Sequence, residues 1–181
     1  GLEQRQILID TSILDIEVNS MNFIEHTIAW CQGEILEGKI IVIYALTLMI
    51  LSIFILPMTH LSNSKFLIIP LLLSALIFLM VGGSLIFKNP QRIKVYQQSF
   101  LENPIEFIKS EKKRTDEFMR WYPKTAWALI IISALALFTW IFVESVSIHY
   151  LCFVILLFCF SGLVIDYFSK ARAQVYLDHI H

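Results

Sequence analysis

The residues best suited to chemistry are charged side chains that lie in three separate stretches of the sequence. Carboxylates and guanidinium groups form strong charge-assisted hydrogen bonds, and groups that converge in a cleft often acquire perturbed pKa values. Helix ends that meet at one edge of a membrane would bring the three stretches together. The candidate cluster comprises Glu34, Glu37, Arg92, Glu111, Arg114, Asp166 and Arg172. Helical spacing alone does not establish that they converge, so the cluster is a hypothesis.

Metal-binding and enzymatic signatures are missing from the sequence. His26, Cys31 and Glu34 have ligand-type side chains, but spacings of five and three residues place them on different parts of a helix surface, and zinc ligands usually recur at tighter spacing. The three cysteines form no metal or disulfide pattern and are interpreted as small packing residues. The sequence has no HExxH, GxSxG, P-loop or glycine-rich nucleotide turn. It therefore predicts no catalytic residue, metal or cofactor.

The elements that position these charges are predicted to be membrane-spanning helices. The 181-residue chain is 57% apolar and 16% charged, whereas a soluble domain is about 45–50% apolar and about 25% charged. Its apolar residues gather in four blocks without Asp, Glu, Lys or Arg, each long enough to cross the bilayer as a helix. The blocks are residues 40–59, 66–87, 125–143 and 145–165. We predict an all-α integral membrane protein built as a four-helix bundle.

The remaining segments are predicted to form helices outside the bilayer. Residues 21–38 form an amphipathic helix with Ile24, Ile28, Cys31 and Ile35 on one face, and Gly38-Lys39 lets the chain turn into the membrane. Residues 88–124 form a two-helix loop, and residues 166–181 extend the fourth span as a helix. The first twenty residues have two interpretations, a native extension or a segment that precedes a native start at Met21.

The two-helix loop carries its own helix-start signals. Asn89-Pro90 and Asn103-Pro104 each place a good N-cap residue before a proline suited to the first helical position. They predict helices over 90–101 and 104–122, with apolar faces at Ile93, Tyr96 and Phe100 and at Ile105, Ile108, Phe118, Met119 and Tyr122. Glu106 completes a capping box with Asn103, and Pro123 marks a break before the third span.

The distribution of Lys and Arg predicts the orientation of the chain. With both termini inside, the cytoplasmic segments hold thirteen of the fourteen basic residues, and the opposite loops hold only Lys65. This bias predicts an N-in, C-in orientation, and the general character of the chain is that of a small protein of the bacterial inner (cytoplasmic) membrane. Residues 1–39 have a net charge of −5 and residues 88–124 of +4. We therefore expect the acidic amphipathic helix to fold against the basic loop and form a helical cytoplasmic cap.

Function follows from the sequence only in outline. No Asp, Glu, Lys or Arg lies in the middle of a span, which disfavours a proton-driven carrier. A net charge of −1 without a recognition module disfavours nucleic-acid binding. The leading hypothesis is a non-enzymatic membrane protein that acts through contacts with lipids, a protein partner or other copies of itself, as a subunit, regulator or immunity-type partner. The alternatives are a homo-oligomeric channel or facilitator, and a membrane enzyme with its site at the cytoplasmic interface.

Overall fold

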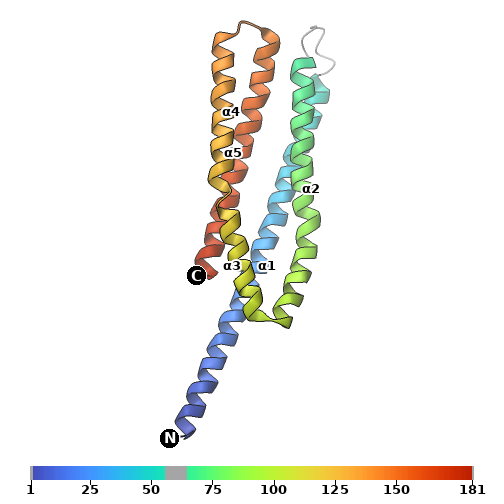
Figure 1. The fold of residues 1–181 in the computed structure, drawn as a ribbon. Helices are drawn as coiled ribbons and strands as arrows, with labels where there is room; N and C mark the ends of the chain where they lie inside the picture. Colours follow the sequence, from blue (N-terminus) through green and yellow to red (C-terminus); the bar gives the residue numbers. More distant parts are fainter. Residues whose placement is uncertain (1, 56–64, 181) are drawn as a thin grey trace.

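The computed structural model describes residues 2–55 and 65–180, with the side chains of 21–55 and 65–178. These residues form five helices: α1 (Leu2–Ile55), α2 (Lys65–Glu102), α3 (Pro104–Met119), α4 (Tyr122–Phe142) and α5 (Val146–Ile180) (Figure 1). No strand occurs in this part of the chain. The described residues are therefore all-helical, as predicted. Four segments are long and apolar enough to cross a membrane, which indicates an integral membrane protein. Residues 56–64 lie outside the described residues. They include the end of the predicted first span and most of the loop that follows it.

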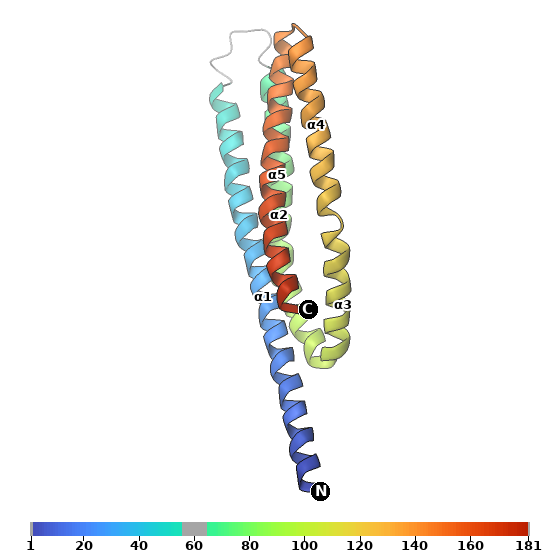
Figure 2. The same cartoon turned by 90° about the vertical axis from the view of Figure 1, so that its left-hand side faces the viewer.

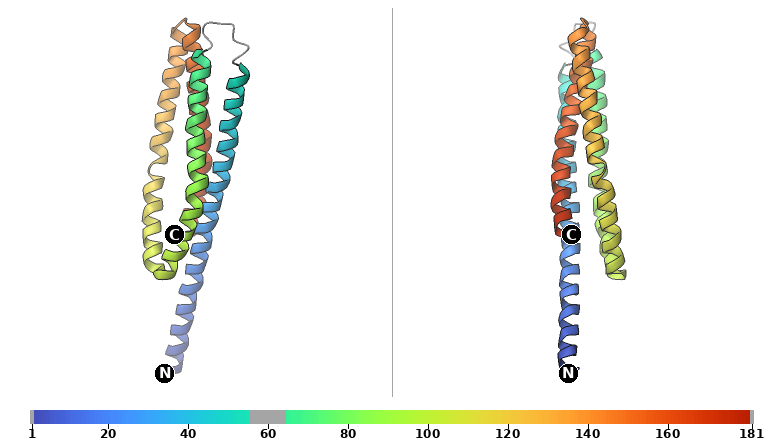
Figure 3. Two further views of the ribbon diagram at one scale, coloured as in Figure 1. Left: turned by 90° about the vertical axis from the view of Figure 1, so that its right-hand side faces the viewer. Right: turned by 60° about the vertical axis from the view of Figure 1, so that its left-hand side comes forward.

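The long helices form two antiparallel pairs. α1 lies along α2, α4 lies along α5, and α5 joins the pairs by contacting both α1 and α2 (Figures 1 and 2). The chain ends of α1 and α5 lie at the same end of the molecule as α3, and the first part of α1 extends beyond the other helices (Figure 3). We call this end the α3 end. α4 is the outermost helix, since only its Tyr122 and Ala136 are buried.

Within the predicted spans, α1, α2 and α5 share an apolar core. Ile41, Ala45 and Leu48 of α1 meet Leu71, Ala75 and Phe78 of α2 and Val154 of α5. α1 and α2 approach most closely at Gly38 and Gly82, where a Cβ on either residue would lie less than 3 Å from the carbonyl oxygen of the other. The missing side chains allow this backbone contact. Gly82 makes this contact, whereas the neighbouring Gly83 faces open space.

Two predicted helix boundaries are wrong. The helix of residues 21–38 and the first span form one continuous helix, because Gly38 serves the contact with α2 instead of a turn. α2 likewise runs through Asn89-Pro90 instead of starting a new helix there. Asn89 is buried, and its side chain donates a 2.9 Å hydrogen bond to the carbonyl oxygen of Leu85 instead of capping a helix.

The signals at the start of α3 are confirmed in part. Asn103 is extended and caps α3, with its side-chain oxygen accepting a 3.2 Å hydrogen bond from the backbone N–H of Glu106. The Glu106 carboxylate accepts a 3.2 Å hydrogen bond from the Asn103 side-chain amide, but the Asn103 backbone N–H donates to the carbonyl oxygen of Ser99, so the predicted capping box is not formed. The chain breaks before α4, at Arg120 and Trp121, with Pro123 in its first turn. α5 continues past the fourth predicted span as expected.

A second apolar cluster lies at the α3 end. Its buried members are Phe23, Trp30, Cys31, Phe107, Tyr176 and Leu177, from α1, α3 and α5. Trp30 stacks on Tyr176 with ring centroids 5.2 Å apart, and the buried Thr27 hydroxyl lies 2.8 Å from the Tyr176 hydroxyl. The predicted faces are partly wrong. Ile28 and Ile35 are only half-buried while Phe23, Thr27 and Trp30 are buried, and Ile105 is 77% exposed while Phe107 is buried. Aromatic partners on α3 and α5, rather than the apolar periodicity of α1, select the buried face.

Candidate functional site

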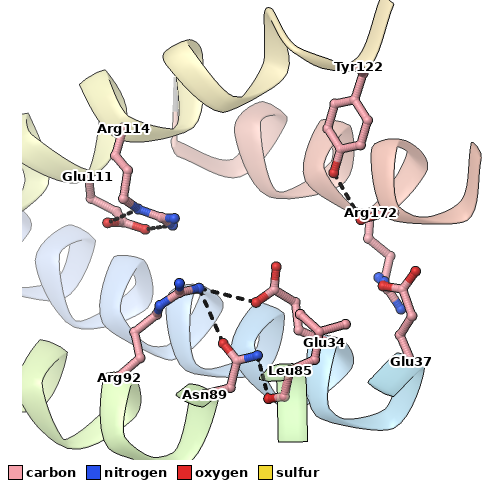
Figure 4. Close-up of polar contacts among 10 residues, drawn as sticks. Glu34, Glu37, Leu85, Asn89, Arg92, Glu111, Arg114, Tyr122 and Arg172 are labelled. Atoms are coloured by element: carbon pink, nitrogen blue, oxygen red, sulfur yellow. Dashed lines mark hydrogen bonds and ion pairs between the residues drawn. The ribbon is translucent and has the colours of Figure 1, made fainter. Parts of the chain in front are cut away.

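Glu34 and Arg92 form the first of three ion pairs at the α3 end. Glu34 is buried on α1, and its carboxylate accepts a 3.2 Å hydrogen bond from Arg92 of α2 (Figure 4). Arg92 also donates a 3.3 Å hydrogen bond to the side-chain oxygen of Asn89, one helical turn earlier. The continuous α2 helix is what carries both Asn89 and Arg92 to the same face. This pair joins α1 to α2 on the α3 side of the Gly38–Gly82 contact.

Glu37 and Arg172 form the second pair, between α1 and α5. Arg172 donates to the Glu37 carboxylate and also to the backbone carbonyl of Gly33, at 3.2 Å. The guanidinium passes over Gly33, where a Cβ would lie 3.5 Å from Arg172 Cδ. Burial lowers the pKa of Arg172, and the nearby charge of Glu34 opposes that shift. Glu37 Oε1 and Arg172 Nε are both buried without a hydrogen-bond partner.

Glu111 and Arg114 form the third pair, within α3. Arg114 binds the buried Glu111 carboxylate with two nitrogens, one of them at 2.9 Å. Its guanidinium carbon lies 4.8 Å from the ring centre of Trp30 and 5.8 Å from that of Tyr96. A desolvated cation over aromatic faces is stabilised by their quadrupoles. Burial alone would lower the pKa of Arg114, but its hydrogen bonds to Glu111 raise it above the ordinary value.

The three pairs share one electrostatic environment around Glu34. Burial raises the pKa of the Glu34 carboxyl above its ordinary value, while Arg92 and, more weakly, Arg114 and Arg172 lower it. Beside it, Cys31 is fully buried, and burial raises the pKa of its thiol to about 12. The thiol is therefore protonated and unreactive as a nucleophile. Six of the seven predicted site residues thus lie near one another and neutralise each other in pairs.

Asp166 is the seventh residue and lies apart from these pairs. It faces α4, where its carboxylate accepts a 3.1 Å hydrogen bond from the Thr125 hydroxyl. Burial raises its pKa, whereas Thr125 and the charge of Lys170 lower it. Asp166 is the first residue after the fourth predicted span and lies on the face of α5 that contacts α4. The prediction that Asp166 joins the cluster is wrong in that respect.

Several polar residues of this end were missed by the sequence reasoning. Asn89 was interpreted as a cap, and the Thr27–Tyr176 contact joins residues 149 positions apart that no local pattern relates. Tyr122 reaches Ser169 through hydroxyls 2.9 Å apart, which ties α4 to α5. Thr27 lies on the face of α1 that also buries residues 23, 30, 34, 41, 45, 48 and 52, but its polar side chain gave no apolar signal for that face.

Two open grooves border the cluster. The α1–α5 groove has a volume of about 390 Å³ and is mainly apolar. It is lined by Ala29, Trp30, Gly33, Phe168, Ala171 and Val175, with Arg172 in its wall. The α2–α3 groove, of about 450 Å³, is more polar and includes Glu102, Glu106, Glu111 and Arg114. Within the part of the chain that the structure describes, no three His, Cys, Asp or Glu side chains are placed to hold a metal ion.

Comparison with known proteins identifies no relative, so a function is inferred from the site alone. No family model matches the chain, and no curated protein or solved structure is significantly similar to it. The arrangement is one of cross-linked helix ends: two ion pairs connect α1 to α2 and α5, and a third fixes α3 against Trp30. Paired charges of this kind hold helices in position and leave the neighbouring grooves available for binding.

Proposed function

We propose that this is a non-enzymatic membrane protein that acts by binding a protein partner, as a subunit or regulator, through the α1–α5 groove. The proposal places the α3 end on the cytoplasmic side, as the distribution of basic residues predicts. In this account the helices at the α3 end form the cytoplasmic cap of a four-helix bundle. The ion pairs keep the cap rigid, so that the groove is formed before the partner arrives.

An apolar groove carries the proposal, because the ends of the apolar blocks, taken as the bilayer boundary, leave part of it beyond the bilayer. Val175 is ten residues past the end of the fourth apolar block, which is about 15 Å along a helix. Each polar layer of a bilayer is only about 5–8 Å thick, so lipid does not cover this position. Yet Val175 is 58% exposed, and Phe168, only three residues past the block and therefore within the polar layer, is 60% exposed. Exposed apolar side chains that form a groove outside the membrane are typical of a protein-binding site.

The shape and chemistry of the groove favour an amphipathic helix as the bound element. A hydrophobic groove between two helices accepts the apolar face of a third helix. Aromatic side chains dominate binding energy at many interfaces, and Phe168 is the aromatic side chain that this groove exposes, whereas Trp30 and Tyr176 are buried at its base. Arg172, in the wall, is already paired with Glu37, so the apolar side chains supply the contact with the partner helix.

Filling the groove tests the proposal. Ala171→Trp places a large ring in the groove, while Gln174→Trp adds the same ring to an exposed position of α5 that does not line it. Each variant is purified gently from its native membrane, and co-purifying proteins are quantified by mass spectrometry. We expect one protein at constant stoichiometry with the wild type and Gln174→Trp, and its loss with Ala171→Trp. Retention of that protein by Ala171→Trp would contradict binding in the groove.

Two other outcomes correspond to the alternatives. A homo-oligomer without any partner would favour a channel or facilitator, which liposome flux assays would then examine. The α2–α3 groove, with carboxylates and a guanidinium in one wall, is the observation that favours a membrane enzyme. A chemical change in co-purified lipid that Glu106→Gln abolishes would favour that function over contact alone.

A further inference from the structure

A groove between α4 and α5 lies where the third and fourth apolar blocks meet the polar residues that flank them. It has a volume of about 340 Å³ and is lined by Tyr122, Ala126, Leu163, Asp166, Tyr167 and Lys170. Ala126 and Leu163 belong to the third and fourth apolar blocks, and Asp166 is the first residue after the fourth. Lys170 follows four residues later, about 6 Å along the helix. The groove thus passes from the hydrocarbon layer into the polar layer.

The groove becomes more polar from its part within the apolar blocks toward Lys170. Its part within the apolar blocks has only aliphatic side chains, and its polar part has one carboxylate and one ammonium group. The Tyr122 hydroxyl is held by Ser169, which fixes the ring as a wall. Lys124, on the same stretch of α4, lies over Trp121 at 4.6 Å and does not line the groove. Asp166 and Lys170 are therefore the charged groups that meet a ligand there.

The geometry points to a phospholipid with a zwitterionic headgroup that bears a primary ammonium group, such as phosphatidylethanolamine, bound between α4 and α5. The ammonium group binds Asp166, the phosphate binds Lys170, and an acyl chain lies along Ala126 and Leu163. This site is independent of the α1–α5 groove and of the proposed partner.

Charge complementarity selects this headgroup over others. A carboxylate has about four lone-pair positions, and the hydrogen bond from Thr125 uses one, so Asp166 can accept further donors. Burial raises the pKa of Asp166, which means that its carboxylate is incompletely solvated and gains from an added cation. An anionic lipid also offers its phosphate to Lys170 but brings no cation to the carboxylate of Asp166. A trimethylammonium headgroup brings a cation without N–H donors.

Native mass spectrometry of the full chain in detergent tests the site. Phosphatidylethanolamine, phosphatidylcholine and phosphatidylglycerol are added separately at equal concentrations, and the bound fraction of each is measured. We expect phosphatidylethanolamine to bind roughly tenfold more tightly than the other two, as the loss of one charge-assisted hydrogen bond implies. Asp166→Asn should remove this preference, and Lys170→Ala should weaken binding of all three lipids.

Matched variants separate the site from general lipid adhesion. Asp178→Asn and Lys94→Ala change exposed charges on α5 and α2 outside the groove and should leave the lipid preference intact. Far-UV circular dichroism verifies that each variant is folded. Equal binding of the three lipids by the wild type would overturn the inference, as would tighter binding of phosphatidylglycerol. An unchanged preference in Asp166→Asn would overturn it as well.

Discussion

Replacing Gly82 by alanine should force α1 and α2 apart at their closest approach. A Cβ at position 82 would lie 2.7 Å from the Gly38 carbonyl oxygen, 2.9 Å from Val42 Cγ2 and 3.1 Å from the Val42 backbone nitrogen. Two of these atoms belong to the backbone and cannot rotate away, so the helices themselves must shift. Overpacking of this kind costs about 1–3 kcal/mol, and the rigid neighbours place the cost toward the upper half of that range.

The net effect includes a small opposing gain. Alanine in a helix interior is about 0.5–1 kcal/mol more favourable than glycine. The free energy of unfolding should therefore fall by about 1–2 kcal/mol in Gly82→Ala, the difference between these two terms. Gly83→Ala is the matched control, because its Cβ would meet no atom within 4 Å and the variant should be at least as stable as the wild type.

The assay is SDS titration in mixed micelles, followed by far-UV circular dichroism. Gly38→Ala should destabilise the protein like Gly82→Ala, since its Cβ would lie 2.8 Å from the Gly82 carbonyl oxygen. The double variant should lose less than the sum of the two single losses, because the first alanine already separates the helices. Equal stability of Gly82→Ala and Gly83→Ala would contradict a steric clash at position 82.

Three further predictions concern the charged end. Burial raises the pKa of Glu34 above its ordinary value of 4.5, so the folded state binds this proton more tightly than the unfolded chain, and stability falls as the pH rises from 4.5 through the raised pKa. Glu34→Gln should remove this slope from melting curves recorded between about pH 5 and 8, whereas Glu25→Gln at an exposed position should retain it. Arg114→Met should cost about 3 kcal/mol in SDS titration because it strands the buried Glu111, and adding Glu111→Leu should recover most of it; no recovery would contradict the pairing. Asn103→Ala should cost about 1 kcal/mol through the lost α3 cap, and an unchanged melting temperature would show that the cap contributes nothing.

Local signals predicted most of the fold because they depend on neighbouring residues alone. The apolar blocks gave the spans, and Asn103 and Glu106 gave the start of α3. Gly38 and Asn89 were misinterpreted because their roles depend on other helices. A glycine weakens an isolated helix, but at Gly38 it admits the backbone of α2, and that contact outweighs the intrinsic preference.

The candidate site was predictable in residue types but not in pairing. Charges at the ends of apolar blocks must meet somewhere near the membrane boundary, which brought Glu34, Arg92 and Arg172 into consideration. Which carboxylate meets which guanidinium depends on the rotation of each helix about its axis. Asp166 illustrates this, since it follows its apolar block directly yet faces α4 and Thr125. The aromatic contacts of Arg114 likewise depend on how α3 folds back over Trp30.

Site-specific photo-cross-linking from Val175 tests the central claim, that the α1–α5 groove binds a protein partner. A photoreactive phenylalanine analogue replaces Val175, which is exposed in the groove, and for comparison Lys113, which is exposed on α3. After irradiation in native membranes, we predict one discrete adduct of defined additional mass from position 175, lost in the Ala171→Trp background and absent from position 113. Cross-links to lipid alone at position 175, or the same adducts from both positions, would contradict the claim.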